Sequence, residues 1–276
     1  MGKDEQDVAM LVREAEGLLG RRVVFDRLMP GGQHALTAVV LDEGRPLVVR
    51  RFPPGDDAVS REAAVLPRLA PLGALAPQLV AHDGDAGHPL IVTTMLDGAT
   101  PPRNLEPDRI AREMARVLAR IHALPGSGLP LNPVAPPTGD GPLARRSRRG
   151  WERLDTSERV LAHTDFWSGN AVWRGASLTG VVDWSGASDG PRGVDLAWCR
   201  QDLVLLGSHD AARLLLREYE SHAGIRIDDM RAWDVHAGAR AEDRVETWAP
   251  NYAGIGRPHL TERVLRERLD AWNQLL

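Results

Sequence analysis

The apolar patterns of this chain separate strand-forming segments from helix-forming segments along its length. In residues 23–94, short runs rich in β-branched residues alternate with turn sequences such as Pro30-Gly31-Gly32. In residues 109–275, apolar residues recur mainly three and four positions apart, as in amphipathic helices. A chain of 276 residues can form two units with a substantial core. We therefore predict an α+β protein with an N-terminal lobe, residues 1–97, built on a small antiparallel sheet. The C-terminal lobe, residues 98–276, is predicted to be mainly helical.

The predicted N-terminal lobe begins with a helix and continues as a meander of strands. The helix covers residues 8–19, and Gly20 follows it as a natural stop. The predicted strands share short apolar runs bounded by turn residues: 23–25, 35–41, 47–51, 78–81 and 90–94. A second helix, before Pro67, lies between the third and fourth strands.

The predicted C-terminal lobe contains several helices joined by less regular segments. These helices share a periodic apolar pattern: 109–124, 194–206, 210–222, 229–248 and 261–275. Residues 125–150 are rich in Pro, Gly and Arg and lack a clean period, so we expect a long surface loop or a partly ordered insertion there. This segment includes the basic run 145–149, but no interleaved aromatic array of the kind that binds single-stranded nucleic acid.

Charge and composition argue against several classes of partner. The formal net charge is −4 and 26% of the residues are charged, so nothing indicates a nucleic acid or an anionic membrane as partner. The single cysteine, Cys199, has no second thiol for a disulfide or a Cys-based zinc site, which favours a reducing compartment. The N-terminal segment is acidic and polar, and no apolar run approaches about 18 residues. We therefore predict a cytoplasmic protein.

The most informative stretch for function runs from Val160 to Trp184. It contains two short β-type runs around Gly175-Ala176-Ser177, and an antiparallel pairing of these runs would bring Asn170 opposite or nearly opposite Asp183. Amide and carboxylate oxygens are the ligands that hard cations such as Mg²⁺ prefer. Asp165 lies in the loop just before this hairpin and can face the same space. A metal site beside a carboxylate that accepts a proton is what phosphoryl transfer to a hydroxyl requires.

The same stretch resembles the catalytic loop and metal-binding segment of aminoglycoside phosphotransferases and choline kinase-like enzymes. The matching residues are His163, Asp165 and Asn170, followed by Val181-Val182-Asp183-Trp184. The resemblance implies a two-lobed protein-kinase-like fold. It also implies that Asp165 is the catalytic base, that Asn170 and Asp183 are Mg²⁺ ligands, and that His163 supports the loop backbone.

The resemblance extends to the nucleotide-binding lobe of this family. Residues 47–50 and 60–63 resemble the strand and helix that carry a phosphate-binding lysine and its glutamate partner, which assigns these roles to Arg50 and Glu62. Lys3 is the single lysine, so an arginine has to replace the lysine here. Gly31 and Gly32 resemble the loop whose backbone N–H groups contact the phosphates.

Residues 90–98 resemble the strand that leads into the lobe connector, where the nucleotide base binds. Thr94 and Leu96 are therefore assigned to the nucleotide site, through backbone groups that would contact an adenine or a guanine edge. ATP and GTP both remain open as the phosphoryl donor. Asp195 lies in a segment that resembles the family's Asp-Leu-Ala helix start, where it suits the first turn or the N-cap.

These observations lead to one main hypothesis and two alternatives. The main hypothesis is a small-molecule kinase that transfers the γ-phosphoryl group of ATP or GTP to a hydroxyl, with Mg²⁺ as cofactor. The acceptor class is left open between an aminoglycoside-like antibiotic and a metabolite, because acidic and basic residues alternate in the C-terminal helices. The first alternative is a non-catalytic nucleotide-binding module, which the arginine at position 50 motivates. The second is a metal-dependent hydrolase that uses His163, Asp165 and Asp183.

Overall fold

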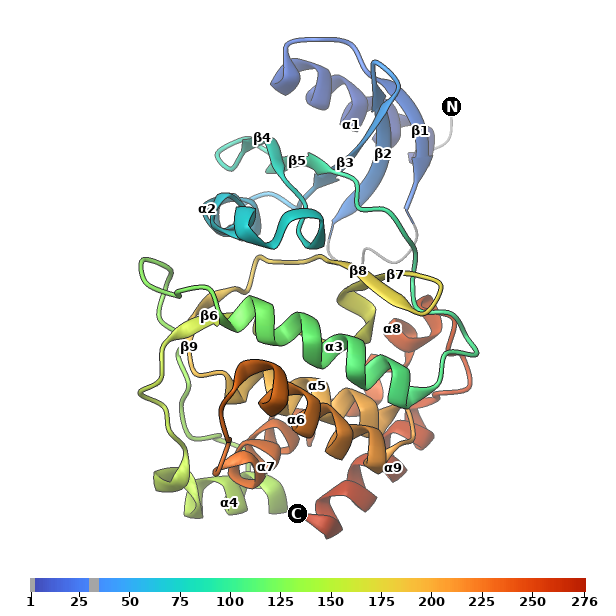
Figure 1. Ribbon diagram of the computed structural model, residues 1–276. Coiled ribbons are helices and arrows are strands. Elements are labelled where there is room, and N and C mark those ends of the chain that lie inside the picture. Colours follow the sequence, from blue (N-terminus) through green and yellow to red (C-terminus); the bar gives the residue numbers. More distant parts are fainter. Residues whose placement is uncertain (1–2, 30–34) are drawn as a thin grey trace. The chain divides into compact units, whose positions relative to one another are not determined.

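The chain forms two compact units. The computed structural model describes residues 3–29 and 35–276. The first unit consists of Met1–Asp97 together with Gly180–Gly186, and the second consists of Gly98–Thr179 together with Ala187–Leu276. A short segment from the middle of the sequence therefore belongs to the first unit. Figure 1 shows strands gathered in the first unit and helices dominating the second, which confirms the predicted α+β class.

Within its described residues, the first unit contains a five-stranded antiparallel sheet in the order β1-β2-β3-β5-β4. The strands are β1 (Val24–Leu28), β2 (Leu36–Asp42), β3 (Arg45–Arg51), β4 (Leu79–Asp83) and β5 (Leu90–Thr94). The register pairs Arg50 on β3 with Thr37 on β2 and with Ile91 on β5. The predicted strands are all present, with ends that differ by a few residues.

Helix α1 (Lys3–Leu19) packs against one face of this sheet. Alternate residues of the inner strands point toward it, as the period of two requires. Together with α1 they form one buried core: Leu11, Ala15, Val23, Ala38, Val40, Leu47, Val49, Leu90 and Val92. Arg51 also lies on the α1 side, where its Nε donates a hydrogen bond to Glu14. Arg50 therefore points to the opposite face, toward helix α2 (Ala58–Val65), which is followed by the 3-10 helix η1 (Leu66–Leu75).

The second unit is mainly helical. Its α-helices are α3 (Pro107–His122), α4 (Pro142–Arg149), α5 (Gly193–Leu205), α6 (His209–Ala223), α7 (Met230–Ala241), α8 (Ala249–Gly254) and α9 (Glu262–Leu275). Helix α5 is buried along most of its length and packs against α6, α7 and α9. A helix whose side chains are apolar, or are polar with buried partners, on all of its faces lies inside its unit.

Short elements connect these helices. Strands β6 (Val160–Ala162) and β9 (Ser188–Gly190) pair antiparallel, and the 3-10 helices are η2 (Trp151–Arg153), η3 (Ser168–Asn170) and η4 (Val245–Trp248). Strands β7 (Ala171–Arg174) and β8 (Ser177–Val181) form a second two-stranded sheet, as the sequence predicted.

Two predictions for the second unit were wrong. The basic run 145–149 is not a loop, because it lies in α4, which begins with Pro142 and buries Leu143, Ala144 and Ser147. This helix is too short for its apolar face to show a period. The helix predicted over 229–248 is broken: α7 ends at Ala241 and η4 begins at Val245.

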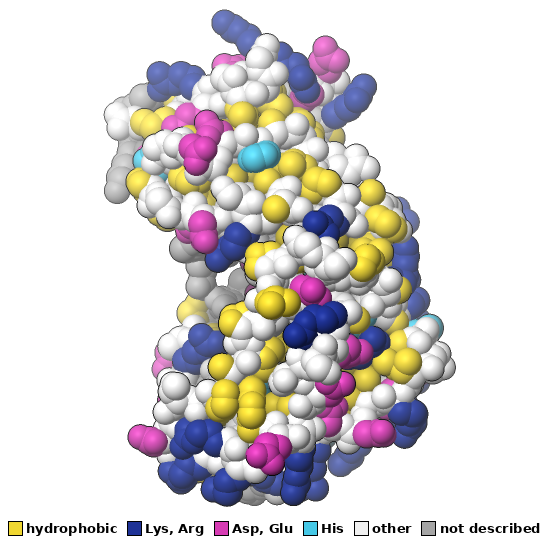
Figure 2. Space-filling model, turned by 90° about the vertical axis from the view of Figure 1, so that its left-hand side faces the viewer, with side chains coloured by type: hydrophobic (Ala, Val, Ile, Leu, Met, Phe, Trp, Pro, Cys, Tyr) yellow, Lys and Arg dark blue, Asp and Glu magenta, His cyan; other side chains and the backbone are white. Residues whose placement is uncertain are grey.

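Charged side chains of both signs share the surface of the second unit. Figure 2 shows basic and acidic groups close together over much of the visible face. Arg213 pairs with Asp210 on α6, and Arg112 on α3 pairs with Glu218. Among the described residues, no helix is long and apolar enough to cross a membrane.

Candidate active site

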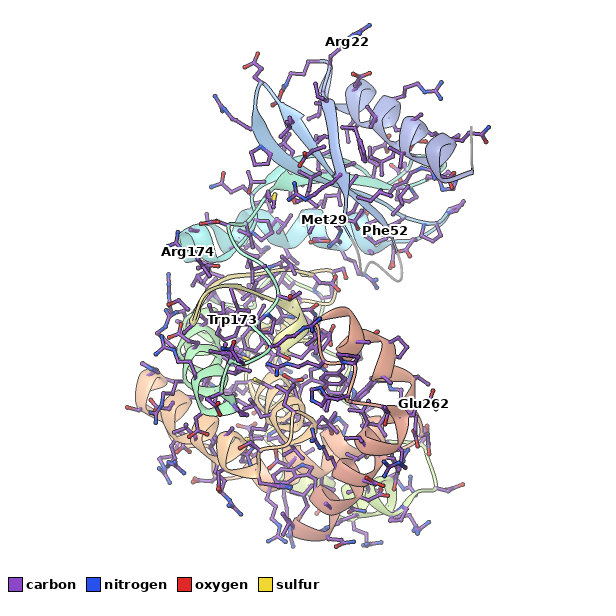
Figure 3. The ribbon with its side chains drawn as sticks, turned by 90° about the vertical axis from the view of Figure 1, so that its right-hand side faces the viewer. Arg22, Met29, Phe52, Trp173, Arg174 and Glu262 are labelled. Carbon is purple, nitrogen blue, oxygen red and sulfur yellow. The ribbon has the colours of Figure 1, made fainter. Side chains whose placement is uncertain are left out.

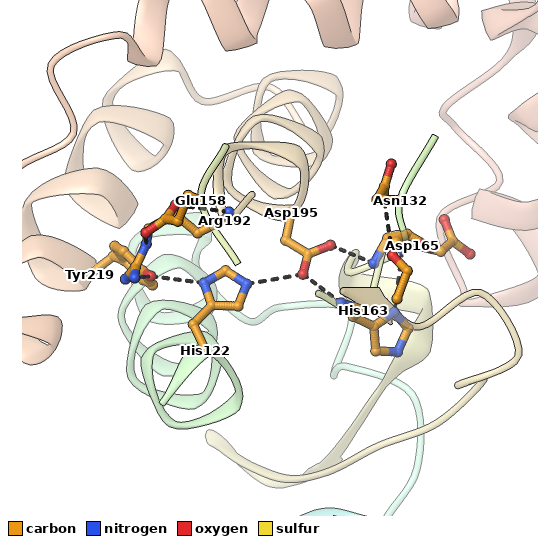
Figure 4. Close-up of polar contacts among 10 residues, drawn as sticks. His122, Asn132, Glu158, His163, Asp165, Arg192, Asp195 and Tyr219 are labelled. Atoms are coloured by element: carbon orange, nitrogen blue, oxygen red, sulfur yellow. Dashed lines mark hydrogen bonds and ion pairs between the residues drawn. The ribbon is translucent and has the colours of Figure 1, made fainter. Parts of the chain in front are cut away.

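The loop that carries Asp165 lies between β6 and η3, and helix α5 holds its backbone. Asp195, in the first turn of α5, is fully buried. Its Oδ2 accepts the backbone N–H of His163 at 2.6 Å, and its Oδ1 accepts the backbone N–H of Thr164 at 2.6 Å (Figure 4). Thr164 has φ +71°, a conformation that is costly for a β-branched residue. The two charge-assisted hydrogen bonds stabilise this backbone.

Two more residues on the same face of α5 contact this loop. Asp195, Trp198 and Asp202 are spaced three and then four residues apart, so they form one stripe along the helix. Trp198 Nε1 donates a hydrogen bond to Asp165 Oδ1 at 2.9 Å. Asp202 Oδ2 accepts the backbone N–H of Ser168 at 2.9 Å. The stripe therefore holds the loop at its beginning, its middle and its end.

The carboxylate of Asp165 has a defined orientation. Its Oδ2 accepts a hydrogen bond from Asn170 Nδ2 at 2.9 Å, and its Oδ1 accepts the one from Trp198. Asn170 Nδ2 also donates to the backbone oxygen of Asp165 at 2.9 Å, and the backbone N–H of Asp165 donates to His163 Nδ1 at 3.3 Å. The structure thus brings Asp165 and Asn170 together, with His163 supporting the loop backbone.

A buried polar chain extends behind the loop. His122, at the end of α3, contacts Asp195 Oδ2 through Nε2 at 3.0 Å and Tyr219 Oη through Nδ1 at 2.8 Å. Arg192 Nη1 donates to Tyr219 Oη at 2.9 Å and pairs with Glu158. Burial raises the pKa of Tyr219 to about 12, so the phenol keeps its proton. His122 therefore links the Tyr219 hydroxyl to the Asp195 carboxylate.

The far end of the loop rests on a second buried carboxylate. Asp202 accepts a hydrogen bond from Tyr252 Oη at 2.8 Å in addition to the one from Ser168. Burial raises the pKa of Asp202, and the hydrogen bonds from Ser168 and Tyr252 act in the opposite direction. Trp167 packs edge-on against Tyr252, with ring centroids 5.5 Å apart. The loop is therefore fixed by both packing and hydrogen bonds.

In the first unit, Arg50 and Glu62 form a buried ion pair. Glu62, on α2, is 2% exposed, and Arg50 Nη2 donates to its Oε2. Burial raises the pKa of Glu62, whereas Arg50 lowers it. The Arg50 guanidinium also lies over the ring of Phe52, with Cζ 5.1 Å from the centroid; Figure 3 labels Phe52 where β3 ends. The pairing that the resemblance implied is thus present in the structure.

Asp183 follows β8 and also belongs to the first unit. It has φ +65°, and its Oδ1 accepts a hydrogen bond from Ser185 Oγ at 3.3 Å. Arg50 Nη1 lies 4.0 Å from the same oxygen. The side chain of Asp183 is 47% exposed. Arg50 therefore lies between Glu62 and Asp183. Asn170 belongs to the other unit, so its approach to Asp183 stays a prediction.

The remaining predicted nucleotide residues lie at the end of the sheet or outside the described part of the chain. Thr94 ends β5, where its Oγ1 accepts the backbone N–H of Gln78 at 2.9 Å. Leu96 packs so close to Gly180 that a Cβ there would lie 2.5 Å from Leu96 Cδ1. Gly31 and Gly32 fall outside the described residues.

The described residues contain no group of three or more His, Cys, Asp or Glu side chains that could hold a metal ion by themselves. Mg²⁺ in nucleotide sites is typically bound through one or two side chains plus phosphate oxygens and water. Asn170 donates through Nδ2, so its hard donor toward a cation is the amide oxygen Oδ1. The half-exposed carboxylate of Asp183 is a donor of the same kind. Each of these oxygens is, by its chemistry, a donor that Mg²⁺ accepts together with phosphate oxygens and water.

Sequence reasoning missed the contacts that orient Asp165. Trp198 lies 33 residues from Asp165, and His122 lies 97 residues from Tyr219. No local pattern reports such a contact. One signal was available, because polar residues at helical spacing in the otherwise apolar segment 193–205 require buried partners.

Comparison with known proteins supports the kinase-like architecture. A model of the phosphotransferase enzyme family matches residues 27–155 and 132–238. Macrolide 2'-phosphotransferase MphH from Brachybacterium faecium is similar in structure, with a TM-score of 0.64, 19% sequence identity, and coverage of 96% of this chain and 97% of that chain. Spectinomycin phosphotransferase APH(9)-Ia, in complex with ADP and spectinomycin, has a TM-score of 0.66, 13% identity, and coverage of 96% and 98%.

Aminoglycoside phosphotransferase APH(3'')-Id from Streptomyces rimosus, in complex with ADP and streptomycin, is also similar, with a TM-score of 0.61 and 18% identity over 86% of this chain and 98% of that chain. A comparison with curated proteins gave no match. At these identities the solved structures establish the fold, and they confirm the predicted kinase-like class. The family match covers most of the chain. The chain therefore belongs to the phosphotransferase enzyme family and is a small-molecule kinase.

Proposed function

We propose that this protein transfers the γ-phosphoryl group of ATP or GTP to a hydroxyl group of a small molecule, with Asp165 as the catalytic base. The observation that carries the proposal is the orientation of Asp165. One oxygen of its carboxylate accepts a hydrogen bond from Asn170 and the other accepts one from Trp198, on a loop whose backbone is held by Asp195. A base has to be oriented before the substrate arrives, because precise placement of the reacting groups supplies much of the rate.

In the proposed reaction, the acceptor hydroxyl donates a hydrogen bond to the Asp165 carboxylate. The hydroxyl oxygen forms a bond to the γ-phosphorus, the bond from that phosphorus to the β,γ-bridging oxygen breaks, and the nucleoside diphosphate leaves with the bonding electron pair. The hydroxyl proton passes to Asp165, which later returns it to solvent. Asp165 therefore acts on the nucleophile alone.

The nucleotide is assigned to the N-terminal lobe, residues 1–97, and the acceptor and the catalytic loop to the C-terminal lobe, residues 98–276. Arg50, oriented by Glu62, is proposed to bind phosphate oxygens, for which its two terminal nitrogens are suited. Gly31 and Gly32 are proposed to contact phosphates through backbone N–H groups, and backbone groups of Thr94 and Leu96 to contact the base. Asn170 and Asp183 would hold Mg²⁺, which neutralises phosphate charge when bound.

The acceptor classes to test first come from the relatives. One of them is a macrolide 2'-phosphotransferase, and two others are complexes with streptomycin and spectinomycin. Antibiotics with free hydroxyl groups are therefore the first candidates, and hydroxylated metabolites follow.

The test is transfer of label from γ-labelled ATP or GTP, with magnesium, to a panel of antibiotics and hydroxylated metabolites. We expect Asp165→Asn to lower turnover by about 100- to 10,000-fold, the usual effect of removing a general base. Asp210→Asn is the matched control, because Asp210 is 86% exposed and pairs only with Arg213 in the described residues. Wild-type turnover by Asp165→Asn would refute the assignment. Nucleotide binding without transfer to any acceptor would favour the non-catalytic alternative.

A further inference from the structure

The side chain of Trp198 lies where an acceptor has to approach Asp165. Its Nε1 is 2.9 Å from Asp165 Oδ1, and its indole is half-buried. A hydroxyl that transfers its proton to Asp165 has to come within about 3 Å of the same carboxylate. The group that bears this hydroxyl therefore meets the indole of Trp198.

Trp198 is part of a larger group of aromatic and basic side chains. Trp248, on η4, packs edge-on against it with ring centroids 5.2 Å apart. The guanidinium carbon of Arg240, on α7, lies 4.9 Å from the centroid of the Trp198 ring, and that of Arg244 lies 5.9 Å from the centroid of the Trp248 ring. Both indoles are half-buried and both arginines are exposed. We call these four residues the Trp–Arg wall.

The Trp–Arg wall carries two positive charges. Burial lowers the pKa of Arg240, and the negative charges of Asp165 and Asp195 act in the opposite direction, so these two carboxylates attract the Arg240 guanidinium without an ion-pair contact. Arg244 Nε donates to the backbone oxygen of Arg240, and neither guanidinium has a carboxylate within ion-pair distance among residues 3–29 and 35–276. This leaves both guanidinium groups able to bind an anion.

Nearby carboxylates are directed to other partners. Glu242 accepts the backbone N–H groups of Leu143 and Ala144 at the start of α4, and Glu246 pairs with Arg266. Asp202, buried under the loop, accepts from Ser168 and Tyr252. Asp243, which precedes Arg244, is exposed and lies on the Gly139 side, where a Cβ at Gly139 would be 3.2 Å from its Oδ2. The surface beside Asp165 is therefore aromatic and cationic.

We propose that the Trp–Arg wall binds the acceptor, and that the acceptor is a hydroxyl compound with an anionic group next to an aromatic or apolar ring. This proposal rests on the proposed function, in which Asp165 receives the acceptor hydroxyl. Guanidinium groups attract carboxylates or phosphates and repel ammonium groups, and the indole faces cover apolar rings. A polycationic aminoglycoside would place its ammonium groups against Arg240 and Arg244. Trp198 has a second role as a positioning residue, because its N–H holds one oxygen of the base.

Binding of matched probes tests the wall without any phosphoryl transfer. The probes are naphthoate and naphthylmethylammonium, which share a ring and differ in charge, and binding is followed by calorimetry with the full chain at low salt. We expect naphthoate to bind at least tenfold more tightly than the ammonium probe. The double variant Arg240→Gln, Arg244→Gln should abolish the difference. Arg149→Gln, which changes an exposed arginine on α4, should preserve it. Equal or tighter binding of the ammonium probe, or a preference that survives in the double variant, would overturn the proposal.

Trp198→Phe separates positioning from binding. This variant keeps an aromatic face but lacks the N–H donor to Asp165. With the acceptor found in the transfer assay, we expect kcat to fall about tenfold while KM stays within twofold, since the lost hydrogen bond acts on the base. Naphthoate binding should be retained, which also shows that the variant is folded. A rise in KM at unchanged kcat would contradict the positioning role. If Asp165→Asn keeps wild-type turnover while the probes bind as expected, the assignment of Asp165 as the base is refuted and anion binding by the Trp–Arg wall is supported.

Discussion

Replacing Asp195 with asparagine is expected to destabilise the second unit and to release the loop that carries Asp165. In the wild-type protein the buried carboxylate accepts three hydrogen bonds, from the backbone N–H groups of His163 and Thr164 at 2.6 Å and from His122 at 3.0 Å. Asparagine has one acceptor oxygen, and its NH₂ group must face at least one of these donors. A buried donor without an acceptor costs about 1–3 kcal/mol, and loss of the carboxylate charge weakens the bonds that remain.

The expected total for Asp195→Asn is therefore about 2–5 kcal/mol. The strained backbone of Thr164, with φ +71°, adds a local effect, because it should relax once its hydrogen bond to Asp195 Oδ1 is weakened. Urea denaturation followed by tryptophan fluorescence gives the free energy of unfolding, and hydrogen exchange of residues 160–170 reports the loop.

Asp210→Asn is the matched control for this measurement. Asp210 also lies in the first turn of a helix, α6, but its side chain is 86% exposed and pairs with Arg213 at the surface. Its replacement should change the free energy of unfolding by less than about 0.5 kcal/mol. If Asp195→Asn behaved like Asp210→Asn, and exchange in the loop were unchanged, the role of Asp195 in holding the loop would be refuted.

Three further predictions concern other buried groups. Arg50→Met removes the ion-pair partner of the buried Glu62 and should lower the free energy of unfolding by about 3–5 kcal/mol, measured by hydrogen exchange in α2. Because protonation removes the charge of Glu62, this loss of stability should become smaller as the pH falls. The second substitution Glu62→Gln should restore the stability of the Arg50→Met variant. Burial lowers the pKa of His236 to about 4, from an ordinary value of 6.5, so the unfolded chain takes up this proton first. About 3 kcal/mol of stability should be lost as pH falls from 6.5 to 4, and a His236→Gln variant should show a smaller loss in urea titrations. Gly98→Ala should lower the melting temperature by several degrees, because φ is +142° and a Cβ would lie 2.6 Å from the backbone oxygen of Trp173; an unchanged melting temperature would contradict this.

The parts of the fold that sequence predicted are those that local patterns determine. Strand β5 follows from a short run of apolar and β-branched residues, and helix α9 follows from helical apolar spacing, with differences of no more than one residue at their ends. Helix α4 was missed because its buried face has only a few, mostly small residues among arginines. A tertiary contact stabilises its start, where Glu242 accepts the backbone N–H groups of Leu143 and Ala144. The break after Ala241 has no glycine or proline to announce it.

The candidate site divides in the same way. Asp165, Asn170 and Asp183 could be named from their spacing and the resemblance that it supports, and the Arg50–Glu62 pair from the strand and helix that carry it. The contact between Asp165 and Trp198 could not be predicted from the sequence, because only tertiary packing brings these two residues together. The sequence therefore indicated the residues proposed to react, and it did not indicate how Asp165 is oriented or what surrounds it.

The stripe on α5 explains why the loop and the helix depend on each other. Asp195, Trp198 and Asp202 span seven positions, which is about 10 Å along a helix axis. The groups that they hold are spread over the loop from His163 to Ser168 in the same order. A shift of α5 by one turn, about 5.4 Å, would move every one of these contacts together. The orientation of Asp165 is therefore set by the packing of α5 inside the second unit, and substitutions that displace this helix should lower turnover without contacting any substrate.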